Sequence, residues 1–494
     1  MRKNLSGRLL VCTIVAALGG LLFGYDTAVI SGADKPMQAL WHTDSWTHGL
    51  VMSSALWGTV IGALIGGWLS DFFGRRKILF WSGVMFFVSA VWSAFPAGPY
   101  TMTVARLIGG FGVGISSVVV PLYNSEIAPP KYRGTLTGLF QFNVIFGMCV
   151  AYISNYFMAR IGDNAWRFML GSEAIPAFLF TVLCPFLVES PRWLIVKRRD
   201  SEGGRNVFAE INPALDAREI DAMVEGVRAE CAARETASAD RGRFFSRTLL
   251  KPILLAFFVA FFNQMSGINA VLYFAPRIFG EAGFATHDAL FQSAGIGIVM
   301  FIGTWIGVAL IDVLGRKTLL LIGGIGYVVS LALCVWGFST GHGSLIPWFL
   351  FAFVAAHGLG QGTVIWVLIS EIFPNRFRGA GQSLGSSTHW IFAALIAFTF
   401  PKLAESFSQS AIFAFFLVMM VLHLIWILTL VPETKGKVLE EIRICSGGED
   451  DDVSSGMHGP YRVRLLRGAS GRPNHRSFKR GSEADSKRKR EYRG

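Results

Sequence analysis

DFFGRRK, residues 71–77, ends the second hydrophobic stretch of the chain, and DVLGRK, residues 312–317, repeats it in the second half. Two further pairs of segments match in the same way: SEIAPPKYRG (125–134) with SEIFPNRFRG (370–379), and ESPRW (189–193) with ETKG (433–436). The members of each pair begin roughly 240 residues apart, and three pairs at nearly one interval indicate an internal duplication. The 494-residue chain is therefore expected to contain two related halves.

The composition is that of a membrane protein. Hydrophobic residues make up 52% of the chain and charged residues only 16%, whereas soluble domains are about 25% charged. The formal net charge of +12 is attributed to Lys and Arg in the loops of one side and to a basic tail, not to nucleic-acid binding.

The sequence shows no catalytic or metal-binding pattern. Its six cysteines are scattered without a CxxC pair, so neither a disulfide framework nor a metal site is expected. No nucleophile-and-base set and no phosphate-binding loop stands out. We therefore expect no enzymatic activity and no cofactor.

Twelve segments are long and apolar enough to cross a bilayer, which takes about 20 residues per helix. They are expected near residues 9–31, 49–70, 78–96, 101–123, 135–158, 167–188, 249–275, 289–312, 318–338, 346–369, 380–402 and 410–431.

Lys and Arg are concentrated in alternate loops and at both ends of the chain, which predicts that both termini lie on the cytoplasmic side. Four regions are expected: a six-helix bundle (1–188), a cytoplasmic helical linker (189–248), a second six-helix bundle (249–432) and a basic tail (433–494). The tail is rich in Gly, Ser and Arg and is expected to be disordered. For a protein of this class an anionic lipid surface is a better partner for such a tail than nucleic acid.

Six motifs in a fixed order carry a resemblance to a known family. They are GWLSDFFGRRK, SEIAPPKYRG, VESPRWL, NQMSGINAVLYF, SEIFPNRFRG and VPETKG. Over about residues 9–440 the chain resembles the sugar porter family of the major facilitator superfamily. GGLLFGYDTAVISG (19–32) and GINAVLY (267–273) are most similar to the bacterial D-xylose–proton symporters and their hexose-carrying relatives.

The resemblance implies an all-α major facilitator fold with intracellular helices, working by alternating access in the inner or plasma membrane. It implies a monomeric symporter that carries D-xylose, or a hexose such as glucose or galactose, together with a proton. An uncoupled facilitator, a polyol or inositol carrier, and a non-transporting sugar sensor that signals through the tail remain alternatives.

Uncharged polar side chains in the seventh span suit a sugar, because an amide offers both donors and an acceptor without a buried charge. Asn263, Gln264 and Asn269 lie in this span, and Gly267 can let the helix bend between them. The resemblance implies sugar contacts or cavity-lining roles for Gln141, Asn263, Gln264, Asn269, Tyr273, Gly362, Trp366, Trp390 and Phe23. The alternative is that these amides only join helices to one another.

Four positions depart from the xylose-type pattern. Methionines replace polar residues at Met148 and Met300, and Asn263 and His389 stand where glutamines are expected. The methionines remove hydrogen-bonding capacity and weaken an assignment to xylose. His389 can contact a sugar hydroxyl, belong to a proton path, or donate to a neighbouring backbone group.

Asp26 lies within the first hydrophobic segment, and Arg106 lies at the start of the fourth. A carboxylate at membrane depth is costly and marks a functional site. A nearby Arg favours the ionised carboxylate and burial favours the neutral one. The resemblance implies that this pair couples transport to protons; a static ion pair or a helix cap is the alternative.

Acidic and basic residues recur at the cytoplasmic ends of the helices. The resemblance implies a ring of ion pairs that closes the inner mouth, formed by Asp71, Arg75, Arg76, Glu126, Arg133, Glu189, Arg192, Asp312, Arg316, Lys317, Glu371 and Arg378. Within the motifs Glu126 stands with Arg133, Glu371 with Arg378, and Glu189 with Arg192. The alternative, that these charges only set topology, is compatible with this role.

Overall fold

The computed structural model describes residues 6–129, 132–239, 244–374 and 377–435, all of which belong to one compact unit. Across these ranges the secondary structure is helical and contains no strand. Twelve helical segments are long and apolar enough to cross a membrane, which confirms the expected number and the all-α fold class. Most of the predicted tail, from residue 436 onward, lies outside the described residues.

The first half provides six of the membrane spans. Its helices are α1 (Gly7–Val29), α2 (Asp34–Trp41), α3 (Ser45–Phe73), α4 (Arg75–Ala94), α5 (Pro99–Ile127), α6 (Arg133–Met158), α7 (Ala165–Ser172) and α8 (Ala174–Leu183). The sixth span consists of α7 and α8, because Pro176 has no N–H to donate to the preceding turn. Glu173 lies at this interruption.

The second half provides the other six spans. Its helices are α12 (Leu250–Met265), α13 (Ile268–Glu281), α14 (Thr286–Leu314), α15 (Arg316–Ser339), α16 (Ile346–Leu359), α17 (Gln361–Ile372), α18 (Arg378–Ser406) and α19 (Gln409–Leu430). Between the halves lie α9 (Pro191–Val196), α10 (Ser201–Ile211) and α11 (Ala217–Ala239). The Trp193 indole donates to the Asp71 carbonyl at 2.8 Å, which fixes α9 at the end of α3.

The seventh and tenth spans are each broken in the middle. Gly267 separates α12 from α13 with a φ of +84°, a backbone conformation that glycine adopts without strain, and it produces the bend expected there. Gly360 separates α16 from α17. Broken helices of this kind at membrane depth are tolerated where they line a cavity.

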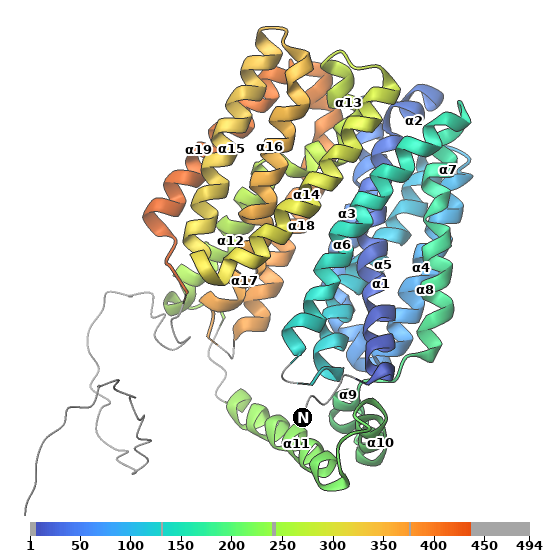
Figure 1. The fold of residues 1–494 in the computed structure, drawn as a ribbon, viewed down its shortest axis with the longest axis vertical. Coiled ribbons are helices and arrows are strands. Elements are labelled where there is room, and N and C mark those ends of the chain that lie inside the picture. The colour runs from blue at the N-terminus through green and yellow to red at the C-terminus, as the bar shows by residue number, and fades with distance from the viewer. Residues whose placement is uncertain (1–5, 130–131, 240–243, 375–376, 436–494) are drawn as a thin grey trace, which may run out of the picture. The chain divides into compact units, whose positions relative to one another are not determined.

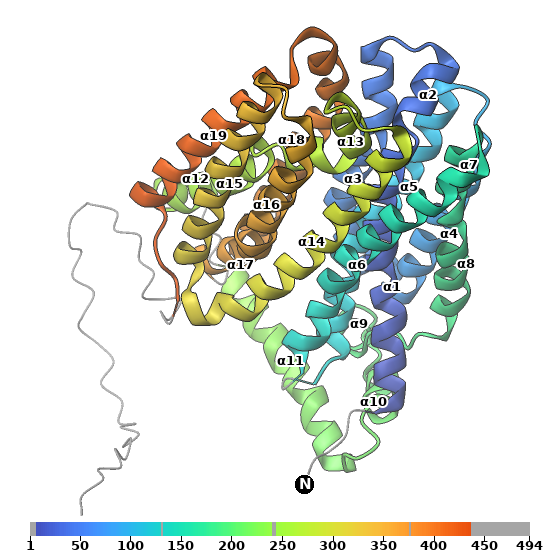
Figure 2. The ribbon, with the colours of Figure 1, turned by 45° about the horizontal axis from the view of Figure 1, so that its top comes forward.

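The two halves lie side by side and are joined by a few helix pairs (Figures 1 and 2). Helix α3 packs on α18, and α6 packs on α14. Within the first half, backbones approach closely: a Cβ on Gly24 of α1 would lie 1.7 Å from the Val144 carbonyl oxygen of α6. Small residues allow this packing in membrane helices.

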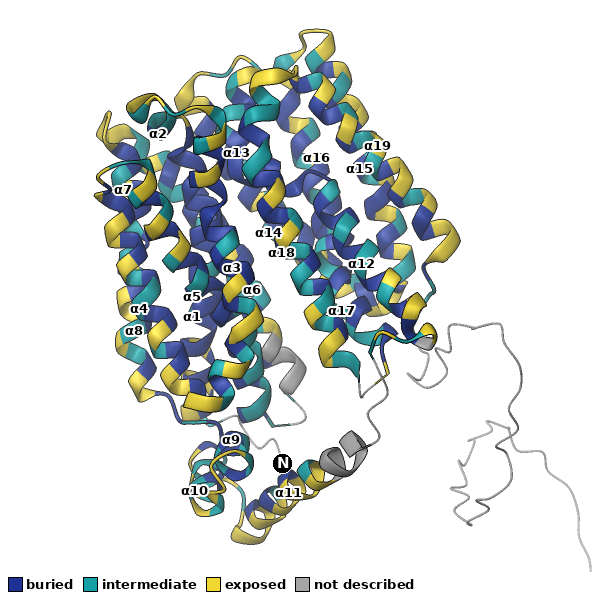
Figure 3. Ribbon diagram, turned by 180° about the vertical axis from the view of Figure 1, so that it is seen from behind, coloured by how far each residue is buried: buried dark blue, intermediate teal, exposed yellow. Residues whose placement is uncertain are grey.

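Burial is distributed as in a membrane protein. Buried residues face the inside of each half, and exposed residues lie along the outer faces of the helices (Figure 3). Large apolar side chains on those outer faces are exposed, among them Trp68, Ile175 and Trp348. A bilayer would cover such a surface, since lipid tails are as apolar as these side chains.

Candidate functional site

A cavity of about 760 Å³ lies between the two halves. Helices α1, α3, α5 and α6 line it from the first half, and α12–α14 and α16–α18 line it from the second. Every expected sugar-site residue except Tyr273 lines this cavity: Phe23, Gln141, Asn263, Gln264, Asn269, Gly362, Trp366, His389 and Trp390. Met148 and Met300 line it too.

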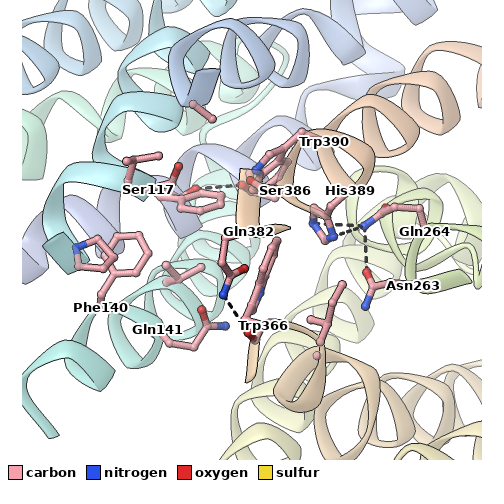
Figure 4. Close-up of a pocket in the computed structure, with 18 of the residues that line it drawn as sticks. Ser117, Phe140, Gln141, Asn263, Gln264, Trp366, Gln382, Ser386, His389 and Trp390 are labelled. Carbon is pink, nitrogen blue, oxygen red and sulfur yellow. Dashed lines mark hydrogen bonds between the residues drawn. The ribbon is translucent and has the colours of Figure 1, made fainter. Parts of the chain in front are cut away.

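Three amides from the broken seventh span are bonded in a row on one side of the cavity. The Asn269 amide donates to the Gln264 side-chain oxygen at 2.5 Å, and the Gln264 amide donates to the Asn263 oxygen at 3.0 Å. The same Gln264 nitrogen lies 3.0 Å from His389 Nδ1 (Figure 4). The bend at Gly267 brings Gln264 and Asn269 together, because the two would diverge on a straight helix.

Aromatic rings line the cavity beside this row of amides. His389 lies with its ring centre 5.1 Å from Trp366 and 4.7 Å from Trp390, and Phe23 lies 5.4 Å from Trp390. The Gln382 amide donates to the Trp366 backbone oxygen at 3.1 Å (Figure 4). Polar donors and acceptors beside flat apolar rings are suited to a ligand with hydroxyl groups on a ring.

The sequence did not single out two further polar residues of the cavity, Gln382 and Ser386, both on α18. They stand four residues apart and therefore on one helix face. The run GQSLGSSTHW, residues 381–390, is polar and small inside an otherwise apolar span, and this was the available signal.

Tyr273, which was expected in the sugar site, lies elsewhere. It does not line the cavity and is 1% exposed. Its hydroxyl is within hydrogen-bonding reach of Thr27 on α1, next to Asp26. Helix α13, which carries Tyr273, packs against α1, and its backbone departs from helical geometry just after Tyr273, at Phe274, where φ is −123° and ψ is 20°. Tyr273 connects α13 to the acidic group in α1.

Asp26 and Arg106 form the expected buried ion pair. Arg106 Nη1 lies 2.5 Å from Asp26 Oδ1, and Nη2 donates to Oδ2 at 3.2 Å and to the Asp26 backbone oxygen at 3.0 Å. The residues are 2% and 1% exposed. The reading of Asp26 as a soluble helix cap is excluded, because the residue lies within α1 and faces α5.

Glu173 is a third ionisable group at this pair, and it was not among the site residues expected from the sequence. It is 2% exposed and lies within hydrogen-bonding reach of Asp26. Its Oε1 atom has no hydrogen-bond partner among the residues that the structure describes. A glutamate in the middle of an apolar span, in SEAIPAF, was the available signal.

A second buried charged group lies at the end of the protein where α2 is found, and it joins the two halves. Arg277 of α13 contacts Asp34 of α2 at 2.7 Å, and His48 of α3 lies 2.6 Å from the same carboxylate. Burial alone would raise the pKa of Asp34, but the charge of Arg277 and the hydrogen bond from His48 outweigh burial and hold that pKa below its usual range. No local sequence pattern predicts this group, because Asp34 and Arg277 are 243 residues apart.

At the other end of the protein, where α9 lies (the α9 end), the charged residues form two similar clusters, one in each half. Arg75 pairs with Glu126 at 2.9 Å and with Asp71 at 3.0 Å. Arg316 makes the equivalent pairs with Glu371 at 2.8 Å and with Asp312 at 2.9 Å. Each arginine therefore holds together helices of its own half.

The partners within these clusters differ from those that the motifs suggested. Glu126 bonds to Arg75, and the side chain of Arg133 lies outside the described part of the chain. Arg192 pairs with Glu230 of α11 at 2.9 Å rather than with Glu189.

Two glutamates instead cap helices. Glu189 accepts from the backbone N–H of Arg75 at 2.9 Å and of Arg76 at 3.2 Å, and Glu433 accepts from Arg316 and Lys317 in the same way. Carboxylates are favoured at helix N-termini, where backbone N–H groups are free. Glu371 is bonded to Arg316, and Arg378 begins α18.

Comparison with known proteins places this geometry in a family. A family model described as "Sugar (and other) transporter" matches residues 12–445. The D-xylose-proton symporter of Escherichia coli (strain K12) is 34% identical over 473 residues, covering 87% of this chain and 94% of the relative. The glucose transporter GlcP of Staphylococcus epidermidis is 35% identical, covering 87% and 95%. The partially occluded inward-open structure of the E. coli xylose transporter XylE is similar, with a TM-score of 0.77 at 32% identity, covering 88% of this chain and all of the other.

Proposed function

Because the chain belongs to the sugar transporter family, we propose that it carries a monosaccharide, D-xylose or a hexose such as glucose, across the membrane together with a proton. It is a multi-pass membrane transporter and not an enzyme. The observation that carries the proton-coupled assignment is the fully buried group formed by Asp26, Arg106 and Glu173.

The charges of this group favour a bound proton. Arg106 contributes one positive charge, and the two carboxyl groups contribute two negative charges when both are ionised. A net negative charge at membrane depth costs several kcal/mol, on the order of 2.5 or more. The group is neutral when one carboxyl holds a proton, so it is suited to bind a proton on one side and release it where water reaches it.

Helix α13 supports a connection between the proton group and the sugar cavity. Asn269 faces the cavity, and Tyr273, one turn later, lies beside Thr27 of α1. A sugar that bonds to Asn269 would pull on the same helix that contacts α1. Asp26 is the residue before Thr27, so a shift of α13 reaches the proton group directly.

Sugar recognition in this proposal comes from the amides and the rings of the cavity. Gln141, Asn263, Gln264 and Asn269 line the cavity and offer amide donors and acceptors to sugar hydroxyls. The Trp366 and Trp390 rings cover the apolar face of the sugar, with His389 between them. The cavity is complete within one chain, which supports a monomeric transporter.

Alternating access is supported by the different contacts at the two ends. The Asp34–Arg277 pair crosses between the halves at the α2 end, whereas the ion pairs of Arg75 with Asp71 and Glu126, and of Arg316 with Asp312 and Glu371, each stay within one half. The cavity lining continues to Gly67 and Gly379, toward the α9 end. We assign the α9 end and both termini to the cytoplasm of a cell membrane, in an inward-facing state.

The proposal is tested by uptake into proteoliposomes against a panel of pentoses, hexoses and polyols, with external pH recorded. Addition of the carried sugar to the wild-type protein is expected to make the medium more alkaline as protons enter the vesicles. Sugar entry without a pH change would identify a facilitator, and uptake restricted to polyols would identify a polyol or inositol carrier. No uptake of any compound would favour the sensor alternative and overturn the proposal.

A further inference from the structure

A chain of side-chain hydrogen bonds leads away from the sugar cavity into the second half. Beyond Asn263, the Asn263 amide nitrogen lies 3.5 Å from the Gln361 side-chain oxygen. The Gln361 amide nitrogen lies 2.6 Å from His423 Nε2. Gln361 begins α17, directly after the break at Gly360, and His423 lies in the middle of α19. Neither Gln361 nor His423 lines the cavity, and both are fully buried.

All hydrogen bonds in this series of side chains run in one direction. Each amide accepts through its oxygen from the preceding side chain and donates through its nitrogen to the next, in the order Asn269, Gln264, Asn263, Gln361, His423. Since an amide nitrogen only donates, His423 Nε2 must be the acceptor and carry no proton. His423 is therefore the terminal acceptor of the chain.

The terminal acceptor decides which end of each amide faces the cavity. An amide can rotate by half a turn and exchange its oxygen and nitrogen with little change in shape. If His423 could not accept, Gln361 would be free to reverse, and Asn263 could then reverse in turn. Gln264 has an acceptor of its own, because its nitrogen also lies 3.0 Å from His389 Nδ1. The pattern of donors and acceptors offered to sugar hydroxyls would change, although no residue of the cavity had been altered.

We propose that His423 and Gln361 are positioning residues that fix the orientation of the Asn263 amide and thereby determine which sugars the transporter prefers. This inference rests on the proposed transport function. The surroundings of His423 are aromatic: its ring lies 5.4 Å from Phe262 and 6.1 Å from Trp426, centre to centre. With Gln361 as the polar partner of its Nε2, a change at His423 acts on this hydrogen-bond chain.

Transport kinetics test the proposal with two carried sugars that differ at one hydroxyl, such as glucose and galactose. His423→Leu removes the acceptor, and KM for the preferred sugar is expected to rise about tenfold, as for the loss of one buried hydrogen bond. The ratio of the two KM values is expected to change by about fivefold or more, while the maximal rate stays within about twofold. His423→Gln restores an acceptor oxygen and is expected to recover most of the preference.

Two comparisons separate positioning from packing. Met420→Leu, at an equally buried position three residues earlier on α19, is expected to leave both KM values unchanged. In an Asn263→Ala background, His423→Leu is expected to have no further effect on KM, because the path through Asn263 is already broken. Equal changes for both sugars, or additive effects of the two substitutions, would overturn the proposal.

The direction of donation along these hydrogen bonds is measured separately from transport. In protein labelled with ¹⁵N-histidine, the Nε2 signal of His423, assigned by its loss in His423→Gln, is expected to be that of an unprotonated nitrogen. A protonated Nε2 would overturn the inference even if sugar transport is normal. Absence of sugar uptake by the wild type would overturn the proposed function, and the histidine signal would still decide whether His423 is the terminal acceptor.

Discussion

Replacing Asp26 by asparagine removes one negative charge from the buried proton group and keeps the shape of the side chain. In the wild type, two guanidinium nitrogens of Arg106 contact the carboxylate, and one of them also donates to the Asp26 backbone oxygen at 3.0 Å. The backbone contact survives the substitution. Glu173 remains beside the pair and supplies a carboxylate that can neutralise Arg106.

The structural cost is therefore smaller than for an isolated buried pair. Removing one partner of such a pair costs about 3–5 kcal/mol when the other charge is left unpaired. With Glu173 as the replacement, we expect Asp26→Asn to lower the free energy of unfolding by only about 1–2 kcal/mol. The double variant Asp26→Asn with Glu173→Gln leaves Arg106 without a carboxylate and is expected to show the full loss.

The functional cost is complete loss of coupling. For one proton per sugar, an inward gradient of one pH unit is worth about 1.36 kcal/mol and supports about tenfold accumulation of sugar. A membrane potential of 100 mV adds about 2.3 kcal/mol, or roughly another 50-fold. In Asp26→Asn the sugar concentration inside the vesicles is expected to rise only until it equals the concentration outside, while exchange of labelled for unlabelled sugar continues.

The assay is sugar uptake by proteoliposomes with an imposed pH gradient, with and without a potential, beside sugar exchange at equal pH. Asp163→Asn, at an exposed carboxyl in the loop before α7, controls for the loss of one acidic group. Accumulation that persists in Asp26→Asn would refute the assignment of the proton to this residue. Loss of exchange together with accumulation would show that the substitution blocks movement and not coupling alone.

Three further substitutions test other parts of the structure. Arg277→Leu leaves Asp34 buried without its arginine, so the contact between the halves weakens and faster hydrogen exchange is expected in α2. Glu433→Gln removes the carboxylate cap of α15 and is expected to cost about 1 kcal/mol in thermal unfolding. Because hydrogen bonds outweigh burial and hold the pKa of Glu433 below its usual value, this stabilisation is complete above about pH 4.3 and is lost as the pH falls through the lowered pKa. Gly267→Ala forces a side chain into positive φ and is expected to cost about 2–4 kcal/mol. Gly226→Ala, inside α11 with open space around it, is expected to stabilise slightly, by up to about 1 kcal/mol, in the same melting experiment.

The sequence was sufficient to predict the helices and most of the cavity, because both depend on local patterns. Span length and hydrophobicity determined the twelve spans, and Gly267 marked the bend that brings Gln264 and Asn269 together. Tyr273 was misplaced because the packing of α13 against α1, which buries its side chain, leaves no mark in the residue pattern.

Partners of buried charges were the least predictable feature. Glu173 is 147 positions after Asp26, and its role appears only when α8 and α1 are packed together. At the α9 end, Arg75 does pair with Asp71 of its own motif, but its second partner, Glu126, is 51 positions away and was expected to pair with Arg133. Many arrangements of a few charges satisfy one sequence, and the packing of the helices selects among them.

The contact between Asp34 and Arg277, which joins the halves, involves equivalent positions of the two halves that carry different residues. An interval of 243 residues, which falls within the 241 to 245 that separate the motif pairs, relates Gly24 to Gly267, Asp26 to Asn269, and Asp34 to Arg277. In a pair of units related by a twofold axis, a residue near the axis faces its own counterpart. Identical charged residues would repel there, so an attractive contact requires the two copies to differ, as Asp34 and Arg277 do. The divergence of Asp26 and Asn269 has the same consequence for function, since a position that carries a carboxylate in one half offers an uncharged amide to the cavity in the other.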